Sequence, residues 1–169
     1  MVRLETVLTS WKAVREDTAG AVEAFPGDEL GYQPMPDVMN FGDIARHILE
    51  SSHALTGMLL DGVENMTGPE FRPMVQKYAE EVRVAAESQA LATQLRDALE
   101  KQLTKLAAQG PEFYAGEITR FDGQRVTRLE MVQFVKEHEL THRAQLFMYL
   151  RMKGIVPPTT RRRLAKAKA

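Results

Sequence analysis

Apolar residues recur at spacings of three and four along most of the chain, which is the pattern of helices that bury one face. The first such run places Trp11 among aliphatic side chains on one stripe and stops at Pro26-Gly27. Clusters of proline and glycine separate the later runs from one another. The pattern predicts helices at residues 2–25, 41–60, 70–87, 89–109 and 128–153.

Three of the predicted helices begin with capping residues, and one of these is Ser88, the N-cap expected for the helix at residues 89–109. Asn40 is a favourable N-cap, and Asp43 lies in the first turn, where the helix dipole favours a negative charge. Thr127 and Glu130 have the spacing of a capping box, which predicts the start of the last helix. Gly154 then ends that helix.

Residues 117–128 have a different pattern, with β-branched residues on both sides of Asp122-Gly123. An Asp-Gly pair in this setting is typical of a hairpin with a two-residue turn, so we predict a short β-hairpin here. Four long helices and one shorter helix otherwise make the fold all-α, and we expect a four-helix bundle.

Size and composition favour one ordinary globular domain. The chain has 169 residues, of which 44% are hydrophobic and 27% charged, and it has no cysteine. It therefore has no disulfide, no thiolate metal ligand and no cysteine nucleophile. It contains no apolar run long enough for a membrane span, and its charged start does not resemble a signal peptide. We expect a cytoplasmic protein without membrane contact.

Positive charge is concentrated at the C-terminal end. The segment 161–169, RRRLAKAKA, holds five positive charges, and the net charge of −1 therefore leaves −6 on the rest of the chain. We expect residues 1–158 to form the bundle and residues 159–169 to form a flexible basic tail. An acidic body does not favour nucleic acid as a partner.

Three histidines are predicted to face one another inside the bundle. His138 and His142 form the motif H-E-L-T-H, and a spacing of four places both rings on one face of a helix. His47 lies between Ile44 and Ile48 on the apolar stripe of the second helix. Buried imidazoles without partners are unfavourable, whereas a shared metal ion would satisfy all three.

The motif also has the form of a zinc protease signature, in which Glu139 would be the general base. That interpretation is not favoured, because no His, Asp or Glu follows His142 to supply a third ligand. Glu139 has two other interpretations. It is a candidate proton acceptor beside the metal, or a surface charge that pairs with Arg143 one turn later.

Three segments together resemble the DinB-like superfamily of metal-binding four-helix bundles, also called DinB/YfiT-like. They are SWKAVREDT (10–18), GYQPMPDVMNFGDIARHILES (31–51) and KEHELTHRAQLFMYLRMKGIVPP (136–158). The resemblance covers residues 1–158 and implies a bundle of this type with one extra shorter helix. It also implies a divalent metal ion, zinc or nickel, held by His47, His138 and His142.

The resemblance further implies a small-molecule substrate and a homodimer. Characterised members of the superfamily use low-molecular-weight thiols as S-transferases or as an isomerase, and others are described as metal-dependent hydrolases. We therefore expect a thiol-dependent S-transferase or a related hydrolase, whose thiol comes from a cosubstrate. The alternative is a non-catalytic dimeric protein that binds a metal or a small molecule. A fourth ligand from His53 or Glu50 would favour that alternative, because structural zinc sites have four protein ligands.

Overall fold

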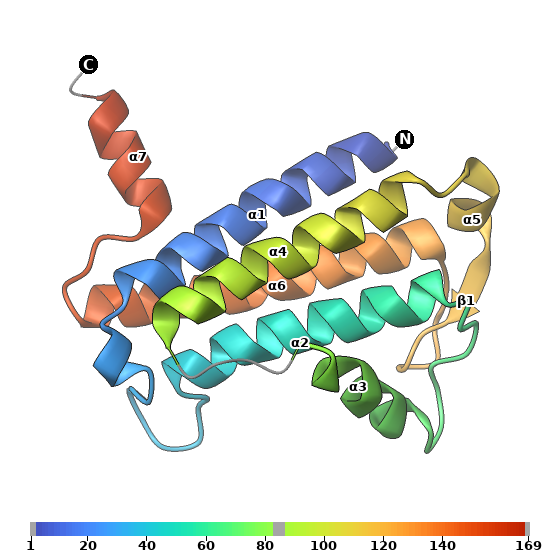
Figure 1. The fold of residues 1–169 in the computed structure, drawn as a ribbon, viewed down its shortest axis with the longest axis horizontal. Helices are drawn as coiled ribbons and strands as arrows, with labels where there is room; N and C mark the ends of the chain where they lie inside the picture. The colour runs from blue at the N-terminus through green and yellow to red at the C-terminus, as the bar shows by residue number, and fades with distance from the viewer. Residues whose placement is uncertain (1–2, 83–86, 168–169) are drawn as a thin grey trace.

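Four long helices lie side by side in the computed structural model, which describes residues 3–82 and 87–167 (Figure 1). They are α1 (Leu4–Ala24), α2 (Phe41–Leu60), α4 (Ser88–Ala107) and α6 (Arg128–Met152). Helices α1 and α2 each pack against both α4 and α6, so they occupy opposite corners of the bundle. The colour sequence in Figure 1 shows that α1 runs parallel to α6, and α2 parallel to α4.

Parallel neighbours require a crossover, and the connection between α2 and α4 supplies it. Helix α3 (Phe71–Glu80) lies in this connection and packs on the outer side of α2. Gly57 permits this approach, because a Cβ atom there would lie 2.7 Å from the Tyr78 ring. The predicted helix at 70–87 is shorter in the structure, and residues 83–86 lie outside the described part of the chain.

Two of the three predicted N-caps are confirmed, whereas Ser88 is already the first residue of α4, whose N-cap position is Glu87 without a side-chain cap. The Asn40 side chain accepts a hydrogen bond from the backbone N–H of Asp43, and α2 has the predicted bounds. Thr127 and Glu130 form the reciprocal capping box at the start of α6. The 3₁₀ turn η1 (Gly27–Glu29) and the short helix α5 (Pro111–Ala115) were not predicted, because elements this short show no helical periodicity.

The predicted hairpin is present, as strands β1 (Glu117–Thr119) and β2 (Arg125–Thr127). The prediction of a two-residue turn is wrong. The Arg120 N–H donates to the Gln124 carbonyl, and the Gly123 N–H donates back to the Arg120 carbonyl. The loop therefore has three residues, and Gly123 takes the left-handed conformation at φ 83° that such a bulged turn requires.

The C-terminal segment that the sequence assigned to a flexible tail forms helix α7 (Pro158–Lys166), which projects from the bundle (Figure 1). Its Arg162 pairs with the buried carboxylate of Asp17 on α1, at 2.5 Å. Arg143 of α6 approaches the same carboxylate at 3.3 Å. This shared acid fixes the position of α7, which no pattern within the tail itself predicts.

The hydrophobic core has two parts, one toward each end of the bundle. A buried polar layer centred on Arg15 and Glu139 lies between them. The candidate metal site is at the same level, since His138 directly precedes Glu139. None of the described helices is long and apolar enough to span a membrane.

Candidate metal centre

His47 of α2 and His138 and His142 of α6 bring their Nε2 atoms together. The His138 Nε2 lies 3.2 Å from the Nε2 of His47 and 3.2 Å from the Nε2 of His142. The two helices are antiparallel neighbours, so one turn of α6 presents both of its rings to the single ring of α2. Within the described residues, these three side chains form the one group of His, Asp and Glu that is arranged to hold a metal ion.

Gln145 fixes the orientation of one ring. The Nδ1 of His142 lies 2.7 Å from the Gln145 Oε1, one turn along α6. An amide oxygen only accepts hydrogen bonds, so Nδ1 carries the proton and Nε2 presents a lone pair. Metal-binding histidines usually have such a partner on the second ring nitrogen.

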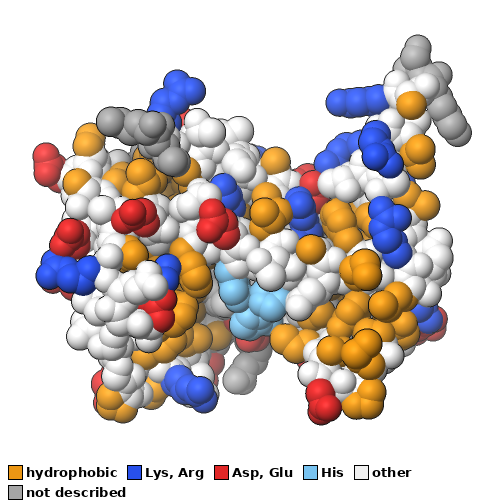
Figure 2. All heavy atoms as spheres, turned by 180° about the vertical axis from the view of Figure 1, so that it is seen from behind, with side chains coloured by type: hydrophobic (Ala, Val, Ile, Leu, Met, Phe, Trp, Pro, Cys, Tyr) orange, Lys and Arg blue, Asp and Glu red, His pale blue; other side chains and the backbone are white. Residues whose placement is uncertain are grey.

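The three rings lie nearer the surface than the sequence predicted, and His142 lines a surface hollow. All three are half-buried, and Figure 2 shows them between two areas of hydrophobic side chains. Burial, together with the neighbouring His142 and His47, lowers the pKa of His138 to about 4. Burial and His142 also lower the pKa of His47. These two rings are therefore neutral near pH 7, as metal ligands must be.

The arrangement fits a divalent metal ion better than it fits hydrogen bonding among the rings. A neutral His138 has at most one proton on Nε2, which can serve only one of its two 3.2 Å contacts. An ion with tetrahedral bonds of about 2.0 Å to nitrogen would hold two ligands about 3.3 Å apart. The chemistry of three imidazole nitrogens suits zinc, nickel, copper or iron.

The two candidates for a fourth ligand do not join this group. His53 lies on another side of α2, where its ring nitrogens contact Glu81 at 3.1 Å and Gln102 at 3.1 Å. Glu50 lines a separate hollow against α3. The three-nitrogen set is thus the complete protein ligand set among the described residues.

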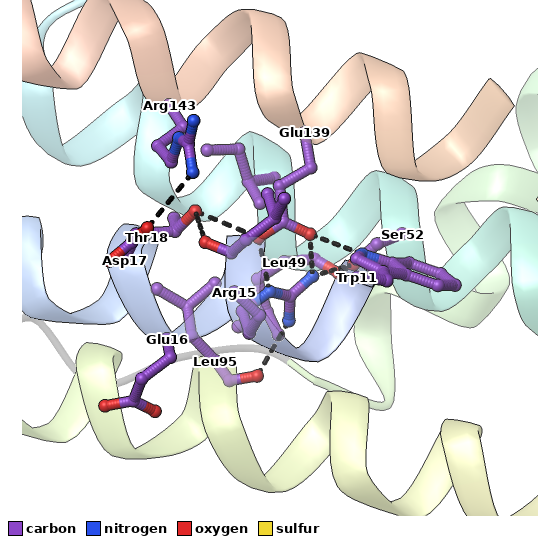
Figure 3. A network of polar contacts seen from close by, with 12 residues as sticks. Trp11, Arg15, Glu16, Asp17, Thr18, Leu49, Ser52, Leu95, Glu139 and Arg143 are labelled. Atoms are coloured by element: carbon purple, nitrogen blue, oxygen red, sulfur yellow. Dashed lines mark hydrogen bonds and ion pairs between the residues drawn. The ribbon is translucent and has the colours of Figure 1, made fainter. Parts of the chain in front are cut away.

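Glu139 points away from α6 into the polar layer and is 1% exposed (Figure 3). Its Oε1 accepts from the Arg15 Nε at 2.7 Å, and its Oε2 accepts from the Trp11 Nε1 at 2.7 Å. The Thr18 hydroxyl is 3.0 Å from Oε1. Arg15 also donates to the Ser52 hydroxyl at 2.8 Å and thereby connects α1, α2 and α6.

The prediction that Glu139 is a surface charge paired with Arg143 is therefore wrong, since Arg143 pairs with Asp17 instead. A proton-transfer role for Glu139 stays a prediction, and the geometry gives it a different task, that of fixing α6 against α1. Sequence analysis missed this layer although it contained a signal. Arg15 lies four residues after Trp11 and three before Thr18, which places a charge within an apolar stripe.

Known protein structures share this fold. A DinB-like protein of Bacillus subtilis, YjoA, is 23% identical over 154 residues, which are 91% of this chain and 93% of YjoA. The crystal structure of YjoA matches with a TM-score of 0.68 and 25% identity, covering 88% of this chain and 92% of that one.

Two further structures share the fold at lower identity. A mycothiol-dependent maleylpyruvate isomerase matches with a TM-score of 0.64 and 15% identity, over 86% of this chain and 61% of the isomerase. YfiT of Bacillus subtilis matches with a TM-score of 0.65 and 13% identity, over 92% of this chain and 91% of YfiT. YfiT is described as a probable metal-dependent hydrolase with an unusual four-helix bundle topology.

The family model of the DinB family matches residues 1–168, which is nearly the full chain and includes α7. The chain therefore belongs to the DinB family.

Proposed function

We propose that this protein is a divalent-metal-dependent enzyme that acts on a small molecule. One observation carries the proposal: three imidazole nitrogens converge at a half-buried position, and no fourth protein ligand joins them among the described residues. A structural zinc site normally has four protein ligands, whereas a catalytic site keeps a position open for water or substrate.

The chain's own residues hold and orient the site. His47, His138 and His142 would bind zinc or nickel, and Gln145 keeps the His142 lone pair directed inward. The polar layer around Glu139 fixes the rotation of α6, which carries two of the three ligands. An ion bound here would supply Lewis acidity, which lowers the pKa of a bound water or thiol toward neutrality.

Two reaction classes are compatible with this site. In a thiol-dependent S-transferase, a low-molecular-weight thiol forms a bond from sulfur to an electrophile. Because the chain has no cysteine, that thiol must be a cosubstrate. In a hydrolase, water attacks an ester or amide. The names of the isomerase and of YfiT, which share the fold, support one class each.

Metal analysis of the untagged protein tests the site. We expect about one zinc or nickel ion per chain in the wild type and its loss in His47→Ala and His142→Ala. His53→Ala is the matched control, because it removes the fourth histidine, which lies outside the group. Equal metal content in all four proteins would overturn the assignment of the ligands.

Activity assays then separate the reaction classes. The metal-loaded protein is supplied with glutathione and 1-chloro-2,4-dinitrobenzene for S-transfer, and with p-nitrophenyl acetate alone for hydrolysis. The reaction class is identified by the assay in which the wild type turns over substrate, His142→Ala has no activity and His53→Ala remains active. Full metal occupancy without turnover of any thiol or ester would instead favour the non-catalytic alternative, a metal-binding dimer.

A further inference from the structure

A hollow of about 410 Å³ opens directly beside the histidines. It lies between the loop at residues 31–40 and the last turns of α6, and we call it the methionine groove. His142 and Gln145 form its inner end, so it continues from the candidate metal site. Four of the other nine lining residues are methionines, Met35, Met39, Met148 and Met152.

These methionines are unusually exposed. Met35 and Met148 are each 55% exposed and Met152 is 52% exposed, whereas Met58 and Met131 are fully buried in the core. Apolar side chains gathered around a concave surface beside a few polar groups are typical of a ligand site. Methionine is flexible and polarisable, so a wall of this kind adapts to apolar groups of irregular shape.

Contacts within the loop and between the loop and α6 support the groove. The Tyr149 hydroxyl donates to the Met39 carbonyl at 2.8 Å, and the Gln33 amide donates to the Val38 carbonyl at 2.6 Å. The Tyr32 ring meets the Tyr149 ring edge-on. The loop is therefore attached to α6 near Met39.

The charge of the groove limits what it accepts. Asp37 is the single charged residue in its lining as described, and no lysine or arginine lines it. In the absence of a bound metal ion, a carboxylate or phosphate in the groove would meet the like charge of Asp37 and no lysine or arginine. An acidic thiol is thus a poor match for this surface, whereas an uncharged apolar group fits it.

We propose that the methionine groove binds an uncharged apolar portion of the substrate and so places the reactive end of that molecule at the histidines. The substrate class is then a hydrophobic small molecule with one polar reactive end. The assignment of the reactive end depends on the proposed function, whereas the binding of the apolar portion depends only on the groove.

The test uses protein with ¹³C-methyl methionine, treated with chelator and titrated by NMR with 1-butanol, 1-hexanol or hexanoate. The methyl signals of Met35, Met148 and Met152 are expected to shift and saturate, while those of Met58 and Met131 stay in place. Burial of two further methylenes predicts about 10-fold tighter binding of hexanol than of butanol. Hexanoate binds more weakly, and Asp37→Asn restores its binding.

Met148→Ser is expected to weaken hexanol binding, and Phe121→Ser is the matched control. Phe121 is 40% exposed and contacts Phe134, which precedes His138 by one turn on the side away from the groove. Shifts of all methionines, equal binding of hexanoate and hexanol, or a loss confined to Phe121→Ser would each overturn the proposal.

Zinc loading distinguishes a failure of the proposed metal site from a failure of the proposed groove. Hexanohydroxamic acid combines the same alkyl chain with a metal-binding end, so it is expected to bind zinc-loaded protein more tightly than hexanol does. If hexanol shifts the methyl signals of the groove but hexanohydroxamic acid binds no more tightly than hexanol, only the metal site would be contradicted. If acetohydroxamic acid binds zinc-loaded protein as tightly as hexanohydroxamic acid does, only the groove would be contradicted.

Discussion

Replacing Glu139 by glutamine would leave a buried arginine without its counter-charge. Arg15 is 2% exposed and Glu139 is 1% exposed, and two short contacts of 2.7 and 2.9 Å join them. Glutamine has nearly the same shape, so the change creates no cavity. Its amide nitrogen would instead face the Trp11 Nε1–H or the Arg15 Nε–H, each of which is itself a donor.

The expected cost is large relative to the stability of the fold. Removing one partner of a buried ion pair typically lowers the free energy of unfolding by about 3–5 kcal/mol. A domain of this size has about 5–15 kcal/mol in total, so Glu139→Gln is expected to fold but to be marginally stable. Glu100→Gln breaks an exposed pair with Lys12, whose side chain is 63% exposed, and is expected to cost less than about 1 kcal/mol.

Urea unfolding, followed by far-ultraviolet circular dichroism in the presence of chelator, measures both variants. A double-mutant cycle with Arg15→Met and Glu139→Leu then isolates the pair. Because the double variant leaves neither charge buried, we expect it to be more stable than either single variant. A loss below 1 kcal/mol for Glu139→Gln, or additive losses in the cycle, would refute the reasoning.

Three further predictions concern the packing, the pH dependence and the metal ligands. Gly57→Ala is expected to lower the free energy of unfolding in urea by about 1–3 kcal/mol, because the alanine methyl group would meet the Tyr78 ring. A gain in stability would show that α3 moves to make room for the methyl group. The hydrogen bond to Asp61 raises the pKa of Tyr78 to about 12, so the stability that this bond contributes is lost as the pH rises above 10. In Asp61→Asn, an absorbance titration should show the pKa of Tyr78 moving back toward 10.0. An unchanged pKa would contradict the role of Asp61. Gln145→Leu removes the acceptor from His142 and is expected to weaken metal binding about 10–100-fold in competition with a chelating dye, whereas unchanged affinity would exclude this role for Gln145.

The starts of α2 and α6 were predictable because each has a local capping signal, whereas α1 and α4 begin without a side-chain cap. Asn40 and Asp43 define the start of α2, and the capping box of Thr127 and Glu130 defines the start of α6. The hairpin turn was harder to predict, since an Asp-Gly pair serves both two-residue and three-residue loops. The order of helices around the bundle depends on tertiary packing, which no local pattern records.

The candidate metal ligands could be grouped from their spacing, but their burial could not be predicted. The periodicity of α6 assigns His138 and His142 to the core, yet Glu139 occupies the most buried position of that turn. A carboxylate is an unfavourable core residue unless its partners are known, and Arg15 is 124 residues away along the chain. The polar layer therefore becomes visible only when α1 and α6 are placed side by side.

That sequence separation has a consequence for biosynthesis. Residue 139 is added 124 residues after Arg15, which at roughly 5–20 residues per second is about 6–25 s later. Until then, α1 presents an apolar face with an unpaired arginine in its middle, and the first three long helices cannot complete their shared core. The nascent chain thus depends on its last long helix, and a product that ends before α6 would expose this face to chaperones and proteases.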